Sequence, residues 1–344
     1  MTLKYIGETP AAGNHAGNKA RRDVDVIFAR RGYELLETVA ETRFDSTLEK
    51  VGYVLRASTW KEILKLRRVK AQLVFAQFPV YGNKLMRETL GDFFSRNRML
   101  FIVHDLDALR NFGSASTADE IKQLNRAEFL IVHNRRMLER LREIGVSTSM
   151  LELELFDYLL DGELPIRPSD SGNAIVFAGN LSKSAFLKSI GELKVQFNLY
   201  GPGGEDLSEL GNVEYRGSFS PEEVPYKLEG GFGLIWDGDS IDTCAGAFGE
   251  YLRLNNPHKL SLYIAAGLPV VTWTRAAIAD FIAENGIGFT VDSLREIPSR
   301  LEKINAAEYR SMLENSARLQ KKIAAGFFTN RALERVEQFL EAKK

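Results

Sequence analysis

Short apolar runs alternate along this chain with longer segments in which apolar side chains recur every three or four residues. The runs are bounded by turn residues, as buried strands are, and the longer segments have the spacing of amphipathic helices. Repeated strand–helix alternation predicts parallel sheets covered by helices. The predicted strands are residues 3–7, 33–36, 71–75, 99–103, 129–132, 174–178, 195–200, 232–236, 268–271 and 288–291. The predicted helices are residues 19–31, 48–66, 84–97, 117–126, 134–144, 306–324 and 327–342, with others that begin at Ser182, Asn256 and after Ala276.

The alternation pauses at residues 157–172, which are rich in Pro, Gly, Asp and Ser and have the composition of an interdomain linker. The length of 344 residues is sufficient for two ordinary domains. We therefore predict an α/β protein with two doubly wound, Rossmann-like domains that face each other across a cleft. The predicted limits are 1–158 and 159–325, followed by a separate final helix at 326–344.

Residues 230–272 form the unit around which the other elements are arranged. An apolar run ends abruptly in Asp237-Gly238-Asp239, a long polar loop follows, and Asn256-Pro257 opens a helix that ends at Gly267. Asn is a favourable N-cap, Pro is tolerated at the first helical position, and Gly is the usual residue after a helix end. Because ligands of open α/β sheets bind at the carboxyl ends of strands, this loop and helix start are expected to form a site.

Lys259 lies in the first turn of that helix, where a cation opposes the helix dipole. The same lysine and the free backbone N–H groups would all favour a bound anion, and a diphosphate suits such a helix end. Tyr251, Arg253, Asn255 and His258 belong to the same loop. The alternative is that Lys259 extends into water as an ordinary surface lysine.

Composition excludes several classes of protein. With 44% hydrophobic and 26% charged residues the chain is globular, and it has no apolar run of the roughly 20 residues that a membrane-spanning helix needs. The single cysteine, Cys244, excludes an intramolecular disulfide and indicates a cytoplasmic location. The four histidines do not have metal-ligand spacing, and the net charge of −1 argues against a nucleic-acid partner.

Charge is distributed unevenly between the two halves. Residues 1–158 contain 25 Lys and Arg against 21 Asp and Glu, whereas the remainder has the opposite bias. Basic clusters occur at residues 67–70, 96–98 and 135–136. A basic first half is compatible with peripheral contact with an anionic membrane surface, and the alternative is that these clusters are solvated faces.

Five motifs resemble those of a known group of enzymes: GLIWDGDS, YLRLNNPHKLSLYIAAGLPVV, AGNLSK, IVHDLDALR and AGNKARRDVD. They look like the bacterial β-1,6-galactofuranosyltransferases of polysaccharide assembly, and they are similar to the glucosyltransferases that extend N-acetylglucosamine on serine-rich adhesins. The resemblance covers nearly the whole chain and implies a GT-B fold, a UDP-sugar donor, a homo-oligomer and a last helix that crosses back onto the first domain. It also implies that Lys259 and Lys183 neutralise the diphosphate. The adhesin branch carries Arg at the Lys183 position, so this sequence matches the galactofuranosyl branch.

The same resemblance implies transfer with inversion, which requires a general base on the acceptor hydroxyl. Asp105 and His104, at the carboxyl end of a first-domain strand, are the candidates, with Asp105 preferred; both could equally have structural roles. No metal or cofactor is expected, because a helix end and lysines can stabilise a leaving diphosphate, and Asp237 is interpreted as lining the donor site. The remaining candidate residues either contact a ligand or pack in the core: Asn180, Tyr200, Trp236, Asn256 and His258 on the donor side, and Gly13, Asn14 and Asn18 on the acceptor side.

The leading hypothesis is an inverting transferase that uses UDP-galactofuranose and a glycan or lipid-linked acceptor. The same chemistry with UDP-glucose is the close alternative, since pocket contacts rather than a motif decide the sugar. A nucleotide-sugar epimerase and a non-catalytic UDP-sugar-binding protein also remain, because a fold alone does not define an activity.

Overall fold

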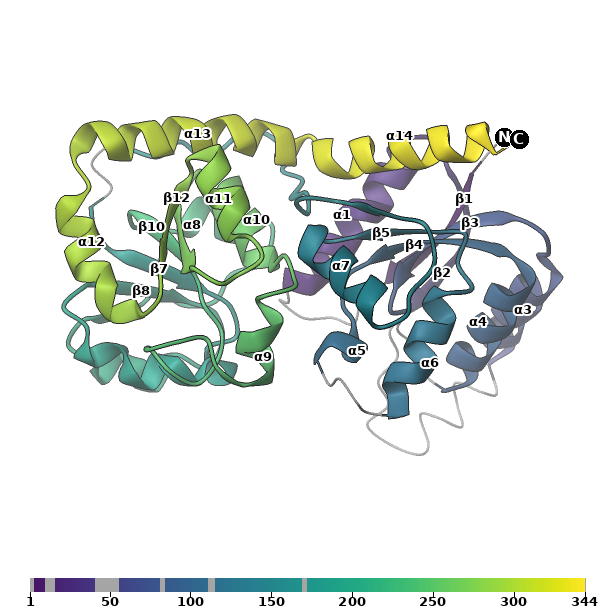
Figure 1. Ribbon diagram of the computed structural model, residues 1–344, viewed down its shortest axis with the longest axis horizontal. Helices are drawn as coiled ribbons and strands as arrows, with labels where there is room; N and C mark the ends of the chain where they lie inside the picture. The colour runs from purple at the N-terminus through teal and green to yellow at the C-terminus, as the bar shows by residue number, and fades with distance from the viewer. Residues whose placement is uncertain are drawn as a thin grey trace.

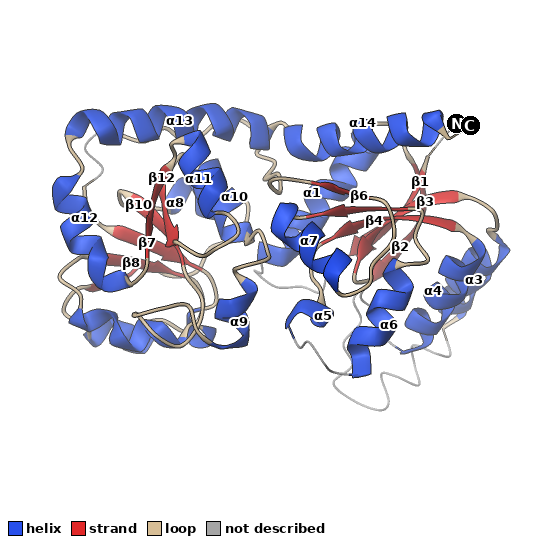
Figure 2. Ribbon diagram, in the orientation of Figure 1, coloured by secondary structure: helices blue, strands red, loops and turns tan. Residues whose placement is uncertain are grey.

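The protein has two lobes, each built on a parallel sheet of six strands (Figure 1). The structure is a computed structural model that describes residues 3–9, 16–40, 56–80, 84–110, 115–168 and 172–343. Helices cover the sheet of each lobe (Figure 2), as strand–helix alternation requires. The predicted α/β architecture of two doubly wound units is therefore confirmed.

The first lobe contains the first sheet, with strand order β2-β1-β3-β4-β5-β6. Its central strands β3 and β4 are buried almost throughout, which explains why they appear in the sequence as continuous apolar runs. The edge strand β6 was not predicted, because its short sequence is only half-buried and carries no apolar run. The strands are β1 (Lys4–Thr9), β2 (Glu34–Ala40), β3 (Leu73–Phe78), β4 (Arg98–Val103), β5 (Phe129–Val132) and β6 (Met150–Glu152). The helices are α1 (Ala16–Arg30), α3 (Ala57–Arg68), α4 (Lys84–Arg96), α5 (Asp107–Arg110), α6 (Ala115–Leu124) and α7 (Arg135–Glu143).

The second lobe contains the second sheet, with strand order β12-β11-β10-β7-β8-β9. The strands are β7 (Ile175–Ala178), β8 (Phe197–Tyr200), β9 (Val213–Tyr215), β10 (Phe232–Ile235), β11 (Val270–Trp273) and β12 (Gly288–Val291). The helices are α8 (Val224–Lys227), α9 (Gly246–Tyr251), α10 (His258–Ala265), α11 (Ala279–Asn285), α12 (Ile297–Lys303), α13 (Ala306–Ala324) and α14 (Phe327–Ala342). Of these strands, β9 was not predicted, because it is a short, half-exposed edge strand.

The helix predicted to begin at Ser182 is absent, and this prediction was wrong. Two 3₁₀ segments, Leu181–Lys183 and Ala185–Glu192, occupy its place. The hydroxyl of Ser184 donates to the carbonyl of Asn180 at 3.1 Å, and local hydrogen bonds of this kind compete with a regular α-helix.

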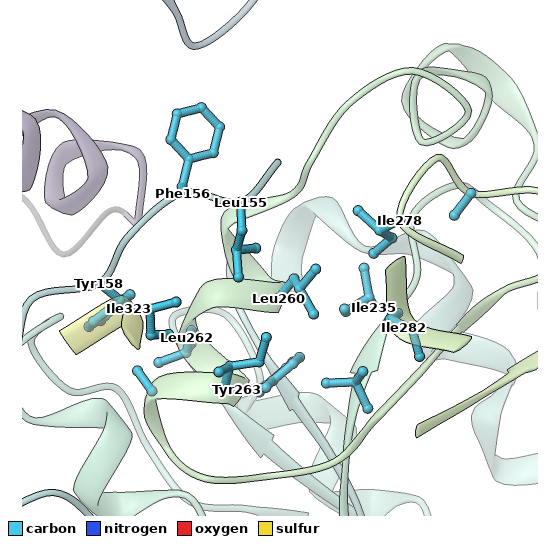
Figure 3. Packing of buried hydrophobic residues seen from close by; sticks show 14 of the residues in the cluster. Leu155, Phe156, Tyr158, Ile235, Leu260, Leu262, Tyr263, Ile278, Ile282 and Ile323 are labelled. Carbon is cyan, nitrogen blue, oxygen red and sulfur yellow. The ribbon is translucent and has the colours of Figure 1, made fainter. Parts of the chain in front are cut away.

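Helix α10 is held against the second sheet by close packing. A Cβ atom on Gly233 of β10 would lie 2.2 Å from the ring of Tyr263, so only glycine lets this ring approach the strand. The Tyr263 hydroxyl then accepts from the N–H of Ala178 at 2.9 Å and donates to the carbonyl of Leu234 at 3.1 Å. Figure 3 shows Leu260 and Tyr263 of α10 within the buried hydrophobic cluster. The strands β7 and β10 therefore fix the position of the amino end of α10.

The last helix returns to the first lobe, as the resemblance implied. Helices α13 and α14 lie along the same side of the molecule, with α13 on the second lobe and α14 on the first (Figure 1). Glu337 of α14 accepts from Arg31 at 2.7 Å and from the hydroxyl of Tyr33 at 2.5 Å. Phe339 packs edge-on against Phe129 of β5, with ring centroids 4.6 Å apart.

The chain also crosses between the lobes after β6, and buried carboxylates hold this crossing. Asp23 of α1 accepts from the N–H of Leu159 at 2.9 Å, and Lys19, which is paired with Asp23, donates to the carbonyl of Leu159 at 2.8 Å. Asp157 accepts from the backbone N–H groups of Phe328 and Thr329 at 3.1 and 2.7 Å, at the start of α14. Burial raises the pKa of Asp157 to about 7, although both N–H groups oppose the shift.

We predict that this carboxyl group makes stability depend on pH. Its pKa is raised in the folded protein, so its protonated form stabilises the fold at low pH. That contribution is lost as pH rises from about 4 to about 7. The free energy of unfolding of the parent should fall relative to that of Asp157→Asn by about 1 to 4 kcal/mol between pH 5 and pH 8. Urea unfolding at several pH values measures this difference.

Asp161→Asn is the matched control, because Asp161 is a fully exposed carboxylate of the same segment. The difference in free energy of unfolding between Asp161→Asn and the parent should be constant over the same pH range. If the difference for Asp157→Asn were constant as well, the raised pKa of Asp157 would be contradicted.

Candidate active site

The amino end of α10 opens onto a pocket of about 350 Å³ at the carboxyl ends of β7 and β8. This volume lies within the range of small-molecule sites, roughly 300 to 1,000 Å³. A Cβ atom on Gly201 would lie 1.8 Å from the carbonyl oxygen of Gly179, so glycine is needed at position 201 where these strand ends meet. The pocket is lined by Tyr158, Ala178, Gly179, Asn180, Tyr200, Gly201, Pro202, Ser218, Phe219, Pro221, Val224, Pro257, His258, Lys259 and Leu262.

Lys259 is the cation of this pocket, and it does not simply extend into water. Its ammonium group pairs with Asp237 at 3.0 Å, and it lies 5.2 Å from the ring centroid of Phe177. Both partners are partly buried, with 18% of the lysine and 29% of the aspartate side chain exposed. Asp237 lies two residues beyond the end of β10, so the strand positions the carboxylate that orients the lysine.

The first turn of α10 differs from the prediction by one residue. Pro257 is the N-cap, with an extended backbone, and the helix begins at His258. Asn256 therefore does not cap this helix. Its side-chain amide and its backbone N–H are engaged in contacts with the first lobe rather than directed at the pocket.

Asn256 ties α10 to the turn between β5 and α7. Its backbone N–H donates to Nδ1 of His133 at 2.9 Å, and its side-chain amide donates to the carbonyls of His133 and Glu154 at 2.8 and 2.9 Å. Its oxygen accepts from Asn134 at 2.7 Å, while the oxygen of Asn134 caps α7 by accepting from Met137. The start of α10 is therefore part of the second lobe and is held in place by hydrogen bonds to the first lobe.

Four of the predicted donor residues line one pocket: Asn180, Tyr200, His258 and Lys259. Asp237 does not line this pocket itself, but it forms an ion pair with Lys259, which does. Trp236, by contrast, is fully buried and donates from its indole nitrogen to the carbonyl of Ser240 at 2.8 Å, which is a core role. Lys183 is exposed on the first 3₁₀ segment and does not line this pocket.

His258 belongs to a buried aromatic cluster between the lobes. Its ring stacks on Tyr158 at 5.2 Å, and Phe156 lies against the rings of His104 and His133 at 5.1 and 4.9 Å. Burial lowers the pKa of all three histidines: that of His258 to about 3, with a contribution from Lys19, that of His133 to about 4, and that of His104 well below its ordinary value. The three imidazoles are therefore neutral at neutral pH.

The geometry distinguishes His104 from Asp105 as candidate bases. The side-chain amide nitrogen of Gln77 donates to the carbonyl of Arg21. The side-chain oxygen of Gln77 therefore faces Nε2 of His104 at 2.7 Å and accepts a hydrogen bond from the N–H group at that position. Nδ1 is then the nitrogen that could accept a proton, and because burial lowers the pKa of His104 it is poorly suited to do so. Burial raises the pKa of Asp105, and neighbouring Arg110, 2.7 Å away, opposes the shift.

Asp105 and Arg110 take part in a contact between the lobes, outside the lining of the pocket. The Arg110 guanidinium lies 4.8 Å from the ring centroid of Tyr251 on α9. The Tyr251 hydroxyl accepts from the N–H of Leu106 at 3.3 Å. Of the predicted acceptor-side residues, Asn18 lies in the first turn of α1, while Gly13 and Asn14 lie outside the described residues.

Sequence reasoning missed several residues of this region. Tyr158 and Phe219 line the pocket, but they appear in the sequence as isolated aromatic residues of loops. Lys19 and Asp23 stand four residues apart in a predicted helix, a spacing typical of surface ion pairs, whereas both are buried. A larger cavity, of about 870 Å³, lies between α4 and α6 and contains none of the predicted residues.

Two features are absent from the part of the chain that the structure describes. In that part of the chain no helix is long and apolar enough to traverse a bilayer. The same residues include no group of three His, Cys, Asp or Glu side chains arranged to hold a metal ion.

The chain matches two family models along most of its length. The N-terminal domain of glucosyltransferase 3-like proteins matches residues 4–155, and the C-terminal domain matches residues 175–336. The β-1,6-galactofuranosyltransferase WbbI of Escherichia coli K12 is 34% identical over 351 residues, which cover 99% of this chain and 100% of that protein. Glucosyltransferase 3 of Streptococcus gordonii is 27% identical over 69% of this chain and 70% of its own length.

Solved structures agree on the fold. The sucrose-phosphate synthase of Thermosynechococcus elongatus superposes with a TM-score of 0.63 at 12% identity, covering 98% of this chain and 100% of that one. HepE of Anabaena, in complex with UDP and glucose, gives 0.59 at 12% identity over 99% of both chains. The two lobes are those of the GT-B class of glycosyltransferases. Within that class the chain belongs to the glucosyltransferase 3-like family, and it is a hexosyltransferase.

We predict that Asn256→Ala uncouples α10 from the first lobe. The change leaves the buried carbonyl of His133 and the half-buried carbonyl of Glu154 without these donors. Each unsatisfied group costs about 1 to 3 kcal/mol, so the free energy of unfolding in urea should fall by about 2 to 6 kcal/mol. Asn255→Ala is the matched control, because no described residue bonds to the Asn255 side-chain oxygen. Equal stability losses in the two variants would contradict the coupling.

Proposed function

We propose that this enzyme transfers galactofuranose from UDP-galactofuranose, with inversion, to a hydroxyl of a glycan or lipid-linked oligosaccharide in cell-surface polysaccharide assembly. The observation that carries the proposal is the pocket at the amino end of α10, where Lys259 and the first-turn N–H groups can receive a diphosphate. The full-length similarity to the galactofuranosyltransferase WbbI supports the choice of sugar. UDP-glucose is the second candidate donor, favoured by the similarity to glucosyltransferase 3 of Streptococcus gordonii.

In this proposal the diphosphate lies against α10 and Lys259, and the nucleoside lies between Tyr200, Asn180 and the loop that carries Phe219. His258, neutral and stacked on Tyr158, packs beside the donor without adding charge. The arrangement stabilises the leaving diphosphate without a metal or cofactor. Asp237 keeps Lys259 extended until the donor arrives.

Asp105 is the proposed general base. A raised pKa matches a carboxylate to proton abstraction near neutral pH, and its contact with Arg110 and Tyr251 fixes its orientation when the lobes are together. The first turn of α1, with Asn18, lies on the proposed acceptor side. We also propose a cytoplasmic location and a homo-oligomer.

A donor panel tests the activity. Purified protein is incubated with UDP-galactofuranose, UDP-glucose or UDP-galactopyranose, with and without a simple glycoside acceptor, and UDP release and glycan products are measured. We expect acceptor-dependent UDP release to be fastest with UDP-galactofuranose. A higher rate with UDP-glucose would assign the second candidate, and donor isomerisation without acceptor would reveal an epimerase. Binding without any product would leave a non-catalytic protein.

We predict that Lys259→Ala weakens UDP binding by about 10- to 100-fold, as loss of a charge-assisted contact of about 1.5 to 3 kcal/mol requires. Uridine, which lacks the diphosphate, should bind both proteins equally in calorimetry. Lys188→Ala, which removes an exposed lysine of the same lobe, is the matched control. Parent-like UDP affinity in Lys259→Ala would exclude a diphosphate at this helix end.

A further inference from the structure

Helix α3 presents an unusual outer face at the end of the first lobe that is remote from the second (Figure 1). Its inner face is buried through Ile63 and Leu66, which are 0% and 1% exposed. On the outer face, Trp60 and Leu64 remain 42% and 49% exposed. They are four residues apart, so they form one apolar stripe on the helix surface.

Basic side chains surround this stripe. Residues 56–70 contain six cations and the single carboxylate Glu62, in a chain whose net charge is −1. Arg67 and Arg68 follow Leu64 by three and four residues and therefore flank the stripe. All six cations are exposed: Arg56, Lys61, Lys65, Arg67, Arg68 and Lys70.

Few carboxylates neutralise these charges. Lys65 pairs with Glu37 at 3.1 Å. Within the described residues, no carboxylate lies within ion-pair distance of Lys61, Arg67 or Arg68. Exposed arginines and lysines on both sides of a tryptophan and a leucine are typical of a surface that lies in the headgroup region of an anionic bilayer.

We propose that this face, Trp60 and Leu64 with the surrounding cations of residues 56–70, docks the enzyme on an anionic lipid surface. The cations bind phosphate groups of the lipids, and Trp60 enters the interface, where its ring and its N–H group are both accommodated. Docking brings the first lobe, the proposed acceptor side, to a membrane. Lipid binding is measured without turnover, so this inference succeeds or fails independently of the donor proposed above.

The intrinsic tryptophan fluorescence of the protein can report docking. It contains three tryptophans, and Trp236 and Trp273 are 0% and 1% exposed, so Trp60 alone responds to a change of solvent at the surface. We expect vesicles of mixed phosphatidylcholine and phosphatidylglycerol to shift the fluorescence to shorter wavelength and to bring the protein into the floated fraction. Pure phosphatidylcholine vesicles should do neither. Trp60→Phe should bind but lose the spectral shift.

Matched variants distinguish binding through this face from attraction that depends only on the net charge of the protein. Arg67→Glu/Arg68→Glu should weaken binding to the anionic vesicles at least about tenfold. Trp60→Ser/Leu64→Ser should weaken it by several-fold. Arg310→Glu/Lys321→Glu makes the same change of net charge on exposed positions of α13 and should bind like the parent. Circular dichroism and UDP affinity verify that each variant is folded.

Four outcomes would overturn the proposal. One is failure of the parent to bind anionic vesicles. Another is an equal loss of binding in the α13 control, which would indicate diffuse electrostatic attraction. The third is a fluorescence shift that persists in Trp60→Phe. The fourth is capture by an acidic protein or nucleic acid in preference to vesicles, which would assign the face to another partner.

Discussion

The structure depends on the junction between Asn256 and the turn that follows β5. Through four hydrogen bonds, the residue before the N-cap of α10 is held by His133, Asn134 and the carbonyl of Glu154. Such buried polar contacts require good geometry from every partner, because any unmade bond leaves a buried group unsatisfied. The consequence is that the amino end of α10, a second-lobe helix, has its position set by the first lobe.

Several buried groups between the lobes carry no net charge, and that property suits the proposed chemistry. The three histidines around Phe156 are kept neutral by burial, and the buried Lys19–Asp23 pair balances itself. Electrostatic interactions are strongest where water and mobile charge are excluded. Lys259 is therefore the dominant cation facing the pocket, and its pairing with Asp237 limits the cost of keeping that charge partly buried.

The sequence predicted the sheets well because buried parallel strands are continuous apolar runs, and residues 129–132 and 288–291 were placed without error. It failed at β6 and β9, where edge strands are short and half-exposed, and at Ser182, where a local hydrogen bond replaced a helix. The position of Lys259 beside a pocket was predictable from helix-capping chemistry. The true role of Asn256 was not, because an Asn before Pro favours a cap locally, and its actual partners are 100 or more residues away in the chain. The pairing of Lys259 with Asp237 depends likewise on tertiary structure.

The two passages of the chain between the lobes lie side by side. The N–H of Tyr158 donates to the carbonyl of Ile323 at 3.3 Å, and Asp157 holds the first turn of α14, so both passages form one bonded strip. Two adjacent crossings of this kind are suited to act as a hinge between the lobes. The lobes should then open and close about this hinge. Residues beside the hinge, including His258, would move little during the motion, whereas the α5–α9 contact would separate first.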